Sequence, residues 1–429
     1  MKVLMFGWEF PPHITGGLGT ACYGLTKSLT KQGVEVIFVV PKLFGKEDKS
    51  FMNLVAAEDI PVEITEKKVR QLFNKLTYIE ISSSLVPYLS PEEYKRFIEE
   101  YKLKELQYEN KVFSTKFSFS GKYGPNIFEE VGRYAITAGV LAQKTDFDII
   151  HAHDWLTYPA GIAAKHVSGK KLVIHVHATE FDRSGENINQ EVYNIEKQGM
   201  EEADLIITVS NYTRNIVINK YGIKPEKVFT VHNGVEPISN IEHFKIEKNL
   251  PYKIVTFLGR ITFQKGPDYF VEAAHKVLQK ADDVHFVMAG SGDMLNRIVK
   301  RVAELRMGDR FHFTGFLQGN EVYKMYAMSD VYVMPSVSEP FGIAPLEAMQ
   351  TDVPVIISKQ SGVSEVLHHA IKIDFWDVDA MADSIYGLLY YKGIRSLFKK
   401  YGRKEVINLR WDNAAFLVTT LYKKLLGIG

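Results

Sequence analysis

The sequence contains almost no cysteine, no long apolar run and almost no net charge, and each absence excludes a class of protein. Cys22 is the single cysteine among 429 residues, so an internal disulfide is impossible and nothing indicates an oxidising compartment. No apolar run approaches the ~18 residues of a membrane span, and the stretch Val3–Trp8 is too short for a signal peptide. A formal charge of +1 gives no electrostatic reason to expect a nucleic acid. We expect a globular, cytoplasmic protein of undetermined oligomeric state.

Short β-branched runs alternate with helical stretches, which predicts parallel sheets built from βαβ units. The first series of runs comprises Val3–Phe6, Val36–Val40, Asp148–His151, Leu172–Val176, Leu205–Val209 and Lys227–Val231. The second series comprises Ile254–Leu258, Val284–Ala289, Phe311–Thr314, Val331–Met334 and Val355–Ile357. We therefore expect two doubly wound α/β domains with a ligand cleft between them, formed by residues 1–235 and 251–410 and joined by a linker at 236–250.

Two segments depart from this alternation. Residues 43–128 form an insertion rich in Tyr and Phe, in which Pro91–Tyr108 is typical of a charged helix. Its rings either make a small core of their own or offer a surface on which sugars stack. The tail, residues 411–429, contains a further helix over Trp411–Leu426, which we expect to fold back onto the first domain.

Glycines and histidines follow the first series of strands, at the ends where parallel sheets bind ligands. Thr15-Gly16-Gly17-Leu18-Gly19 precedes a helix and is either a phosphate-binding turn or a tight turn without a ligand. His151-Ala152-His153-Asp154-Trp155 and His175-Val176-His177 follow two later strands, with each histidine pair on one face. Such histidines can bind a metal, and His151 and His175 can instead be hydrogen-bonded core residues. For His153 we favour contact with the substrate.

The second series carries charged residues at its strand ends. Its first strand runs into a glycine-bounded loop that holds Arg260 and Lys265. Two cations on such a loop suit a diphosphate, because Arg offers a planar fork and Lys a mobile point charge. A later strand leads to Glu339 in a loop and Glu347 in the next helix, and Gly342 between them lets the backbone pass close to a sugar. We expect both carboxylates to face the cleft.

Together these residues resemble those of retaining GT-B glycosyltransferases, and most closely the glycogen (starch) synthase branch. The matching pieces occur in family order along nearly the whole chain: Thr15-Gly16-Gly17-Leu18, His151-Ala152-His153-Asp154-Trp155, Asn233-Gly234-Val235, Arg260 with Lys265-Gly266, and Glu339-x₇-Glu347. The resemblance implies the GT-B fold, in which two Rossmann-like domains face each other across a cleft and a C-terminal helix returns to the first domain.

The resemblance also implies a role for each candidate. Arg260 and Lys265 would neutralise a nucleotide diphosphate as it leaves, and Glu339 would support the positive charge that develops at the anomeric carbon. The remaining residues would bind the donor. From the first domain, His153 and Asn233 would contact the hexose, and the turn at Gly17 would also contact the donor. From the second domain, Glu347 would bind the ribose, Phe316 would lie beside the base, and the backbone of Phe341, Gly342 and Ile343 would bind sugar hydroxyls.

Other glycosyltransferases bind a metal through Asp-x-Asp, and this chain has two such triplets. Asp146-Phe147-Asp148 precedes a strand, which places it at the opposite edge of the sheet from the cleft. Asp377-Val378-Asp379 opens a helix and is typical of a helix cap. We therefore expect neither a metal nor another cofactor.

The function implied by the resemblance is transfer of glucose from UDP- or ADP-glucose to the non-reducing end of an α-1,4-glucan, with the anomeric configuration kept. Ile14 stands where bacterial ADP-glucose synthases usually carry Lys, so the base of the donor stays open. The alternatives are a sucrose, trehalose or lipid-linked saccharide synthase on the same fold, a nucleotide-sugar epimerase, and a metallohydrolase that uses the histidines. The expected partners are a nucleotide-sugar donor and a saccharide acceptor.

Overall fold

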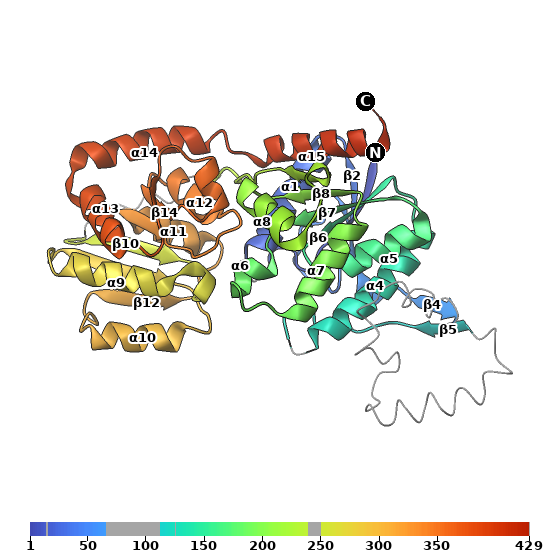
Figure 1. The fold of residues 1–429 in the computed structure, drawn as a ribbon, viewed down its shortest axis with the longest axis horizontal. Coiled ribbons are helices and arrows are strands. Elements are labelled where there is room, and N and C mark those ends of the chain that lie inside the picture. Colours follow the sequence, from blue (N-terminus) through green and yellow to red (C-terminus); the bar gives the residue numbers. More distant parts are fainter. Residues whose placement is uncertain (14–15, 66–111, 125, 239–249, 429) are drawn as a thin grey trace, which may run out of the picture.

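The computed structural model describes residues 1–13, 16–65, 112–124, 126–238 and 250–428. The chain forms two lobes, each a parallel sheet between helices, and the last two helices run along one side from the second lobe to the first (Figure 1). Two parallel sheets of Rossmann type confirm the predicted fold class. Among the helices of the described residues, none combines the length and apolar character needed to cross a membrane.

The first sheet has seven strands in the order β3-β2-β1-β6-β7-β8-β9, all of them parallel. Its order reverses between β1 and β6, which is the switch point where ligands bind in doubly wound folds. The strands are β1 (Lys2–Phe6), β2 (Glu35–Val40), β3 (Asn53–Ala56), β6 (Ile149–His153), β7 (Lys171–Val176), β8 (Leu205–Thr208) and β9 (Val228–Thr230). The helices of this lobe are α1 (Gly17–Lys31), α4 (Ile127–Lys144), α5 (Tyr158–Ser168), α6 (Glu180–Ser184), α7 (Gln190–Glu202) and α8 (Asn211–Tyr221).

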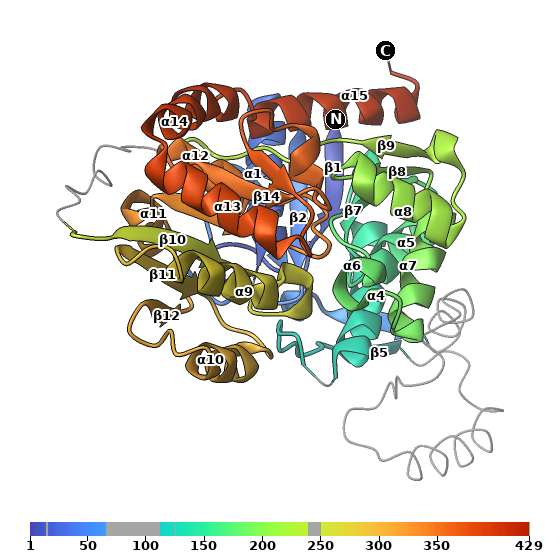
Figure 2. The ribbon, with the colours of Figure 1, turned by 60° about the vertical axis from the view of Figure 1, so that its left-hand side comes forward.

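The second sheet has six parallel strands in the order β12-β11-β10-β13-β14-β15, with its switch point between β10 and β13. The strands are β10 (Lys253–Leu258), β11 (Val284–Ala289), β12 (Phe311–Gly315), β13 (Val331–Met334), β14 (Val355–Ser358) and β15 (Ile371–Ile373). The helices of this lobe are α9 (Pro267–Leu278), α10 (Leu295–Glu304), α11 (Asn320–Met328), α12 (Ala344–Gln350), α13 (Val378–Tyr390) and α14 (Lys392–Val406). The last helix, α15 (Trp411–Leu426), packs against α1 of the first lobe. Figure 2 shows α9 and α13 side by side on one face of this sheet.

Three features of the fold differ from the sequence prediction. β3 lies within the supposed insertion yet pairs with β2 in the main sheet, and β15 adds an edge strand that we did not predict. Both are short, at four and three residues, so they carry little periodic signal. The supposed insertion also contains an antiparallel pair of strands, β4 (Val62–Thr65) and β5 (Val112–Thr115). The predicted charged helix at Pro91–Tyr108 and most of the aromatic insertion lie outside the described residues.

Alternate side chains of the central strands pack against different helices. Leu4 and Phe6 of β1 face the core that α4, α5, α7 and α8 cover, whereas Val3 and Met5 face α1 and α15. This alternation follows from the two-residue period of a strand. Trp411, at the start of α15, is buried in the second of these cores, so the last helix completes a face that α1 alone would leave open. The prediction that the Trp411–Leu426 helix returns to the first lobe is thereby confirmed.

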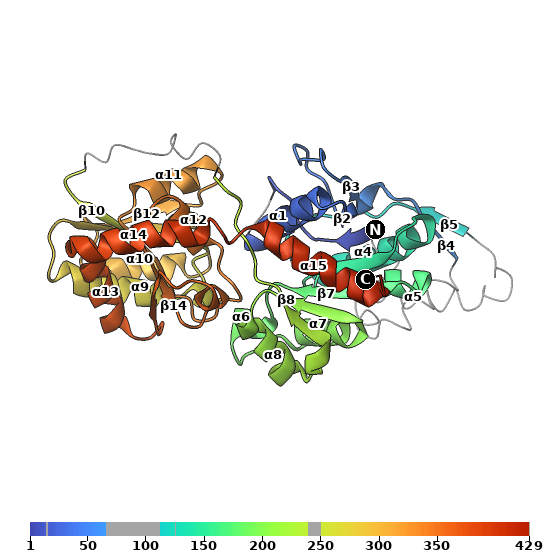
Figure 3. The same ribbon diagram turned by 90° about the horizontal axis from the view of Figure 1, so that it is seen from above.

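The two chain segments that connect the lobes lie against each other. The amide of Val235 donates to the carbonyl oxygen of Leu409 at 2.9 Å, and the two segments pass side by side between the lobes when seen from above (Figure 3). A Cβ atom on Gly234 would lie 2.3 Å from the backbone nitrogen of Trp411, so the contact needs glycine there. On the first lobe, the indole of Trp411 lies over Gly24 of α1, where a Cβ atom would come within 2.2 Å of Nε1.

Replacing Gly24 with Val should separate α15 from α1 and lower the free energy of unfolding by about 1–3 kcal/mol, because the added methyl groups overlap the indole. Chemical denaturation followed by circular dichroism measures the change. Gly393→Ala in α14 is the control, since no heavy atom lies within 4 Å of the position that its Cβ atom would take and alanine favours a helix. Equal stability of Gly24→Val and the wild type would contradict this packing.

Candidate active site

The loops at the second switch point bring Lys265 and Glu339 into direct contact. Lys265 ends the short 3₁₀ helix η5 (Phe263–Lys265) after β10, and Glu339 follows β13, the neighbouring strand. Lys265 Nζ lies 2.5 Å from Glu339 Oε2, and the same oxygen accepts a hydrogen bond from Ser336 Oγ at 3.0 Å. The Glu339 side chain is only 8% exposed, so its charge is compensated inside the fold.

The backbone after Glu339 makes a tight turn into α12. Gly342 has φ +98°, a conformation that other residues rarely adopt, and a Cβ there would crowd Met334 and the Cγ atom of Glu339. Phe341 is buried in the core beneath the turn, while Ile343 precedes the first residue of α12 and is half-buried. Pro345 has no amide proton, and the amides of Leu346 and Glu347 donate to the carbonyl oxygen of Ile343, so the amide donors that this turn can offer to hydroxyl groups lie before Pro345.

Glu347 lies in the first turn of α12. The hydroxyl of Tyr326 donates to its Oε2 atom over 3.4 Å. Burial raises the pKa of Glu347 to about 7, although the hydrogen bond from Tyr326 acts in the opposite direction. A carboxyl group with such a pKa binds or releases a proton near neutrality.

Arg260, a predicted partner of the diphosphate, and Phe316, the predicted partner of the base, lie near two glycine turns that contact each other. Arg260 Nη2 donates to Gln264 Oε1 at 3.3 Å, within the loop that also carries Lys265. A Cβ on Gly290 would lie 1.9 Å from the carbonyl oxygen of Gly259, so the turns after β10 and β11 touch through their backbones. Phe316 directly follows β12 and is 51% exposed, which leaves its ring accessible to a planar ligand.

The first lobe contributes a stack of four histidines at the ends of β6 and β7. His151 and His153 have ring centroids 4.3 Å apart, as do His175 and His177, in agreement with the prediction that each pair shares a face. His153 Nδ1 lies 2.9 Å from His177 Nε2, and His151 Nδ1 is hydrogen-bonded to the hydroxyl of Tyr422 in α15. Burial, and then the neighbouring imidazoles, lower the pKa of His151, His153 and His175, so these rings are neutral.

Two predictions for these histidines are affected by their burial. Neither ring nitrogen of His175 has a hydrogen-bond partner, so the interpretation of His175 as a hydrogen-bonded core residue is wrong. His151 does have one hydrogen bond, to Tyr422. His153 is fully buried, and its Nε2 atom also has no partner. In this arrangement His153 presents no surface to a ligand.

The other first-lobe candidates are Gly17 and Asn233, and they differ in exposure. Gly17 begins α1 and is exposed, and the carboxylate of Glu9 holds the turn by accepting from the amide of Gly19 at 3.1 Å. Ile14 and Thr15 lie outside the described residues. Asn233 is buried in the segment that connects the lobes, and the ring of the preceding His232 lies 6.1 Å from that of Phe341. The residue before Asn233 is therefore near the loop that carries Glu339.

Polar contacts between the lobes surround the Glu339 loop, and we did not predict them. Ser338 Oγ donates to Asp182 Oδ1 at 2.6 Å and lies 3.0 Å from the hydroxyl of Tyr212, both in the first lobe. Asp182 belongs to a capping box with Thr179, which was the only sign of its position in the sequence. These contacts join residues far apart in the chain, so no local pattern reveals them.

Glu365 makes a second bridge between the lobes. Its carboxylate accepts from the amides of Asn211 and Tyr212 at 2.9 and 2.7 Å, at the start of α8, and lies 2.8 Å from His232 Nε2. Burial pushes the pKa of Glu365 upward, but the hydrogen bonds from His232 and the two amides outweigh it and keep the pKa below its ordinary value. A carboxylate from one lobe thus caps a helix of the other.

The two Asp-x-Asp triplets lie away from these loops. Asp148 precedes β6, where its Oδ2 atom accepts from the amide of Lys2 at 2.7 Å, at the edge of the sheet opposite to His153. Asp377 is the N-cap of α13 and accepts from the amide of Ala380. The expected cap is confirmed.

Glu347→Gln should make the protein less sensitive to pH. A carboxyl whose pKa is about 7 in the fold and about 4.3 when unfolded binds its proton more tightly in the fold, so stability falls as pH rises from about 4.5 to 7. The melting temperature of Glu347→Gln relative to the wild type should therefore increase between pH 5 and pH 8. Glu226→Gln controls for the loss of an exposed carboxylate. A constant difference between Glu347→Gln and the wild type across this range would contradict the raised pKa.

Comparisons with known proteins agree with this architecture. Residues 2–231 match the family model of the starch synthase catalytic domain, and residues 239–405 match that of the group 1 glycosyl transferases. An uncharacterized glycosyltransferase of Methanocaldococcus jannaschii is 27% identical over 99% of this chain and 98% of its own length. The glycogen synthase of Mycobacterium tuberculosis is 24% identical over 86% of this chain and 80% of its own length.

A solved structure shows the same fold. The sucrose-phosphate synthase of Thermosynechococcus elongatus superposes with a TM-score of 0.71 at 18% identity, over the full length of both chains. One family model matches the first lobe and the other matches the second, in the order in which GT-B enzymes carry them. The chain belongs to the GT-B glycosyltransferases, in the group whose first domain is the starch synthase catalytic domain.

Proposed function

We propose that this protein transfers glucose from a nucleotide-glucose to the non-reducing end of an α-1,4-glucan, keeping the anomeric configuration and using no metal ion. The observation that carries the proposal is the Lys265–Glu339 pair at the second switch point, beside the turn at Gly342. It supplies a cation and a carboxylate where a glycosyl diphosphate has a leaving group and a reacting carbon. The similarity to glycogen synthase supports glucose and glucan as substrates.

The cations act on the leaving group. As the bond between the anomeric carbon and the phosphate oxygen breaks, negative charge grows on that oxygen. Lys265 and Arg260 belong to one loop, so both can approach a diphosphate placed over it. Preorganised charges of this kind stabilise the transition state more than the ground state.

Glu339 acts on the sugar. A diphosphate that binds Lys265 draws this cation away from Glu339, whose Oε2 atom keeps the hydrogen bond from Ser336. The carboxylate then supports the positive charge that develops at the anomeric carbon. We propose that the acceptor hydroxyl attacks from the face that the diphosphate leaves: the new bond to the acceptor oxygen forms, and the hydroxyl proton passes to the departing phosphate. This route keeps the configuration without an enzymic nucleophile.

The remaining contacts hold the donor in place. Glu347 accepts hydrogen bonds from the ribose, Phe316 lies beside the base, and the amides around Gly342 hold sugar hydroxyls. Asn233 reaches the hexose from the segment between the lobes. His153 is buried, so its contact with the hexose requires a local rearrangement of the first lobe, of the kind that accompanies cleft closure.

Incubation with UDP-, ADP- or GDP-glucose and a short maltooligosaccharide tests the proposal. We expect UDP- or ADP-glucose to lengthen the acceptor, with an α-anomeric proton in the NMR spectrum of the new linkage, and the same nucleotide diphosphate to raise the melting temperature. Formation of sucrose or trehalose alone, from fructose or glucose as acceptor, would show that the acceptor is a small sugar and not a glucan. An inverted β-linkage would contradict the retaining mechanism.

Glu339→Ala should abolish transfer in a folded protein, and Lys265→Ala should lower kcat on the order of 10²–10³-fold with a smaller change in donor affinity. Steady-state kinetics measure both effects. The matched controls are Asp379→Ala and Lys276→Ala, because Lys276 Nζ and Asp379 Oδ1 form an ion pair of the same 2.5 Å length on the surface of the same lobe. The controls should keep wild-type rates.

A donor with a better leaving group separates the two roles. It should partly restore the rate of Lys265→Ala, because less charge has to be stabilised on the departing oxygen, but it should not restore Glu339→Ala. Equal recovery of both variants, or an unchanged kcat for Lys265→Ala, would show that the leaving-group assignment is wrong.

A further inference from the structure

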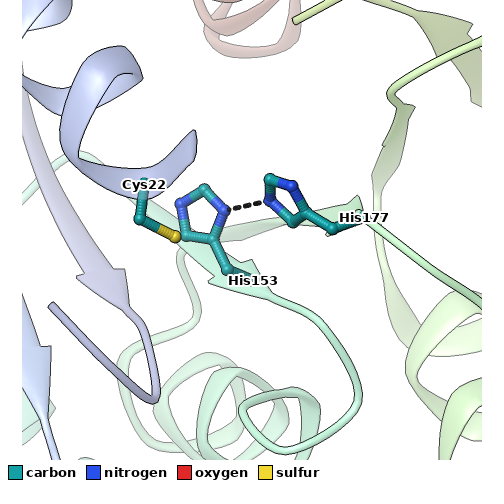
Figure 4. Close-up of side chains that lie close together, drawn as sticks. All are labelled: Cys22, His153 and His177. Atoms are coloured by element: carbon teal, nitrogen blue, oxygen red, sulfur yellow. Dashed lines mark hydrogen bonds between the residues drawn. The ribbon is translucent and has the colours of Figure 1, made fainter. Parts of the chain in front are cut away.

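Three soft, metal-binding side chains converge in the first lobe, from segments far apart in the chain. Cys22 comes from α1, His153 from the end of β6 and His177 from the turn after β7 (Figure 4). One ligand atom from each side chain lies within 4.8 Å of those of the other two. Neither a strand pattern nor a spacing in the sequence places Cys22 next to the histidines.

Buried ring nitrogens without partners indicate that this cluster is suited to more than packing. His153 is fully buried, and its Nε2 atom lacks a hydrogen-bond partner. Both ring nitrogens of the neighbouring His175 also lack a hydrogen-bond partner. An unsatisfied buried polar group is destabilising, and native folds rarely keep several together without a compensating interaction. On His153 the unpartnered Nε2 atom lies across the ring from Nδ1, so an ion held together with His177 would take the place of the hydrogen bond between His153 Nδ1 and His177 Nε2.

The ring geometry favours Cys22, His153 and His177 over the three inner histidines. The rings of His151, His153 and His175 are stacked, with interplanar angles of 18–27°, so their in-plane lone pairs run side by side and do not converge. His153 and His177 instead face each other edge to edge, with Nδ1 and Nε2 2.9 Å apart and the rings tilted by 38°. His153 itself has no exposed surface, whereas His177 is half-buried, so the side of His177 is where an ion can reach the pair.

The surrounding charges suit a cation. The carboxylates of Asp154 and Glu9, both buried, lie near the Cys22 thiol. Asp154 Oδ1 also accepts from the backbone amides of His177 and Ala178 at 2.8 and 3.2 Å, which fixes the turn that carries His177. Such outer contacts orient the ligands of a metal site.

We propose that Cys22, His153 and His177 bind a single Zn²⁺ ion, and that this ion inhibits the transferase by occupying His153. One thiolate and two imidazoles are the ligands that Zn²⁺ prefers, and hard cations such as Mg²⁺ are disfavoured by them. Binding releases the thiol proton to solvent, and a water molecule completes the tetrahedral coordination. The inhibition rests on the proposed function, in which His153 contacts the hexose, but the binding does not.

Metal binding is measured on the full-length protein after treatment with a chelator. Calorimetric titration with Zn²⁺ should give one site per chain, and Co²⁺ should produce the near-ultraviolet charge-transfer band of a cobalt–thiolate bond. Cys22→Ala should lose the band, and its affinity for Zn²⁺ should fall at least about tenfold. His177→Ala should weaken binding but keep the thiolate band.

His312→Ala is the matched control. His312 Nε2 lies 2.8 Å from His285 Nδ1 on the second lobe, so the variant breaks a similar histidine pair that has no cysteine among its contacts. It should bind Zn²⁺ like the wild type. Melting curves identify any variant that fails to fold, and Cys22→Ser is a second variant at the same position. Absence of a thiolate band in the wild type, or equal Zn²⁺ affinity of the wild type and a folded Cys22 variant, would overturn the site.

Inhibition is measured separately, with the donor and acceptor that support transfer. Chelator-treated wild-type protein should lose activity as Zn²⁺ fills the site seen by calorimetry, whereas Cys22→Ala should keep its own zinc-free rate over the same range. Full activity of the zinc-loaded wild type would overturn the inhibition. If no sugar acceptor is found at all, the proposed function fails, but calorimetry and the cobalt spectrum still decide the metal site.

Discussion

The position of one lobe relative to the other depends on the close contact between the two connecting segments. Gly234 lies against the backbone of Trp411, and the Trp411 indole in turn lies over Gly24 of α1. Each contact requires a residue without a Cβ atom, so both are specific to this crossing. Because α15 also covers one face of the first sheet, the fold of the first lobe includes a helix that is reached only through the second. Any movement of the lobes has to pivot near this crossing.

Around that crossing, polar groups join the lobes alongside apolar contacts such as those of Val209 and Val235 with the cluster that holds Phe341. Ser338 binds Asp182 and Tyr212, and Glu365 caps α8 while it pairs with His232. Hydrogen bonds of this kind exchange readily with water, so they suit a cleft that opens and closes. They also lie next to Glu339, so a movement of one lobe relative to the other would change the surroundings of this carboxylate.

The two halves of the cleft differ in their electrostatics. In the second lobe, the negative charge of Glu339 is balanced by its ion pair with Lys265. The first lobe has neutral imidazoles whose pKa values are lowered by burial, beside a thiol and the carboxylates of Asp154 and Glu9. A diphosphate therefore has its natural partner in the second lobe, and a soft cation has its natural partner in the first. The proposed metal-independent transfer and the proposed zinc site would therefore use different groups of side chains.

The sequence by itself determined the two series of strands, the returning helix and the residues at the strand ends, because alternation of apolar residues and glycine-rich turns are local patterns. It also indicated that Lys265 and Glu339 follow strands of one sheet. Only the tertiary structure decided that these two side chains touch, since that depends on β10 and β13 being neighbours. The bridge between Asp182 and Ser338, 156 residues apart, and the approach of Cys22 to His153 and His177 depend on packing alone. Such contacts arise where helices and loops from distant segments meet, and no local periodicity encodes them.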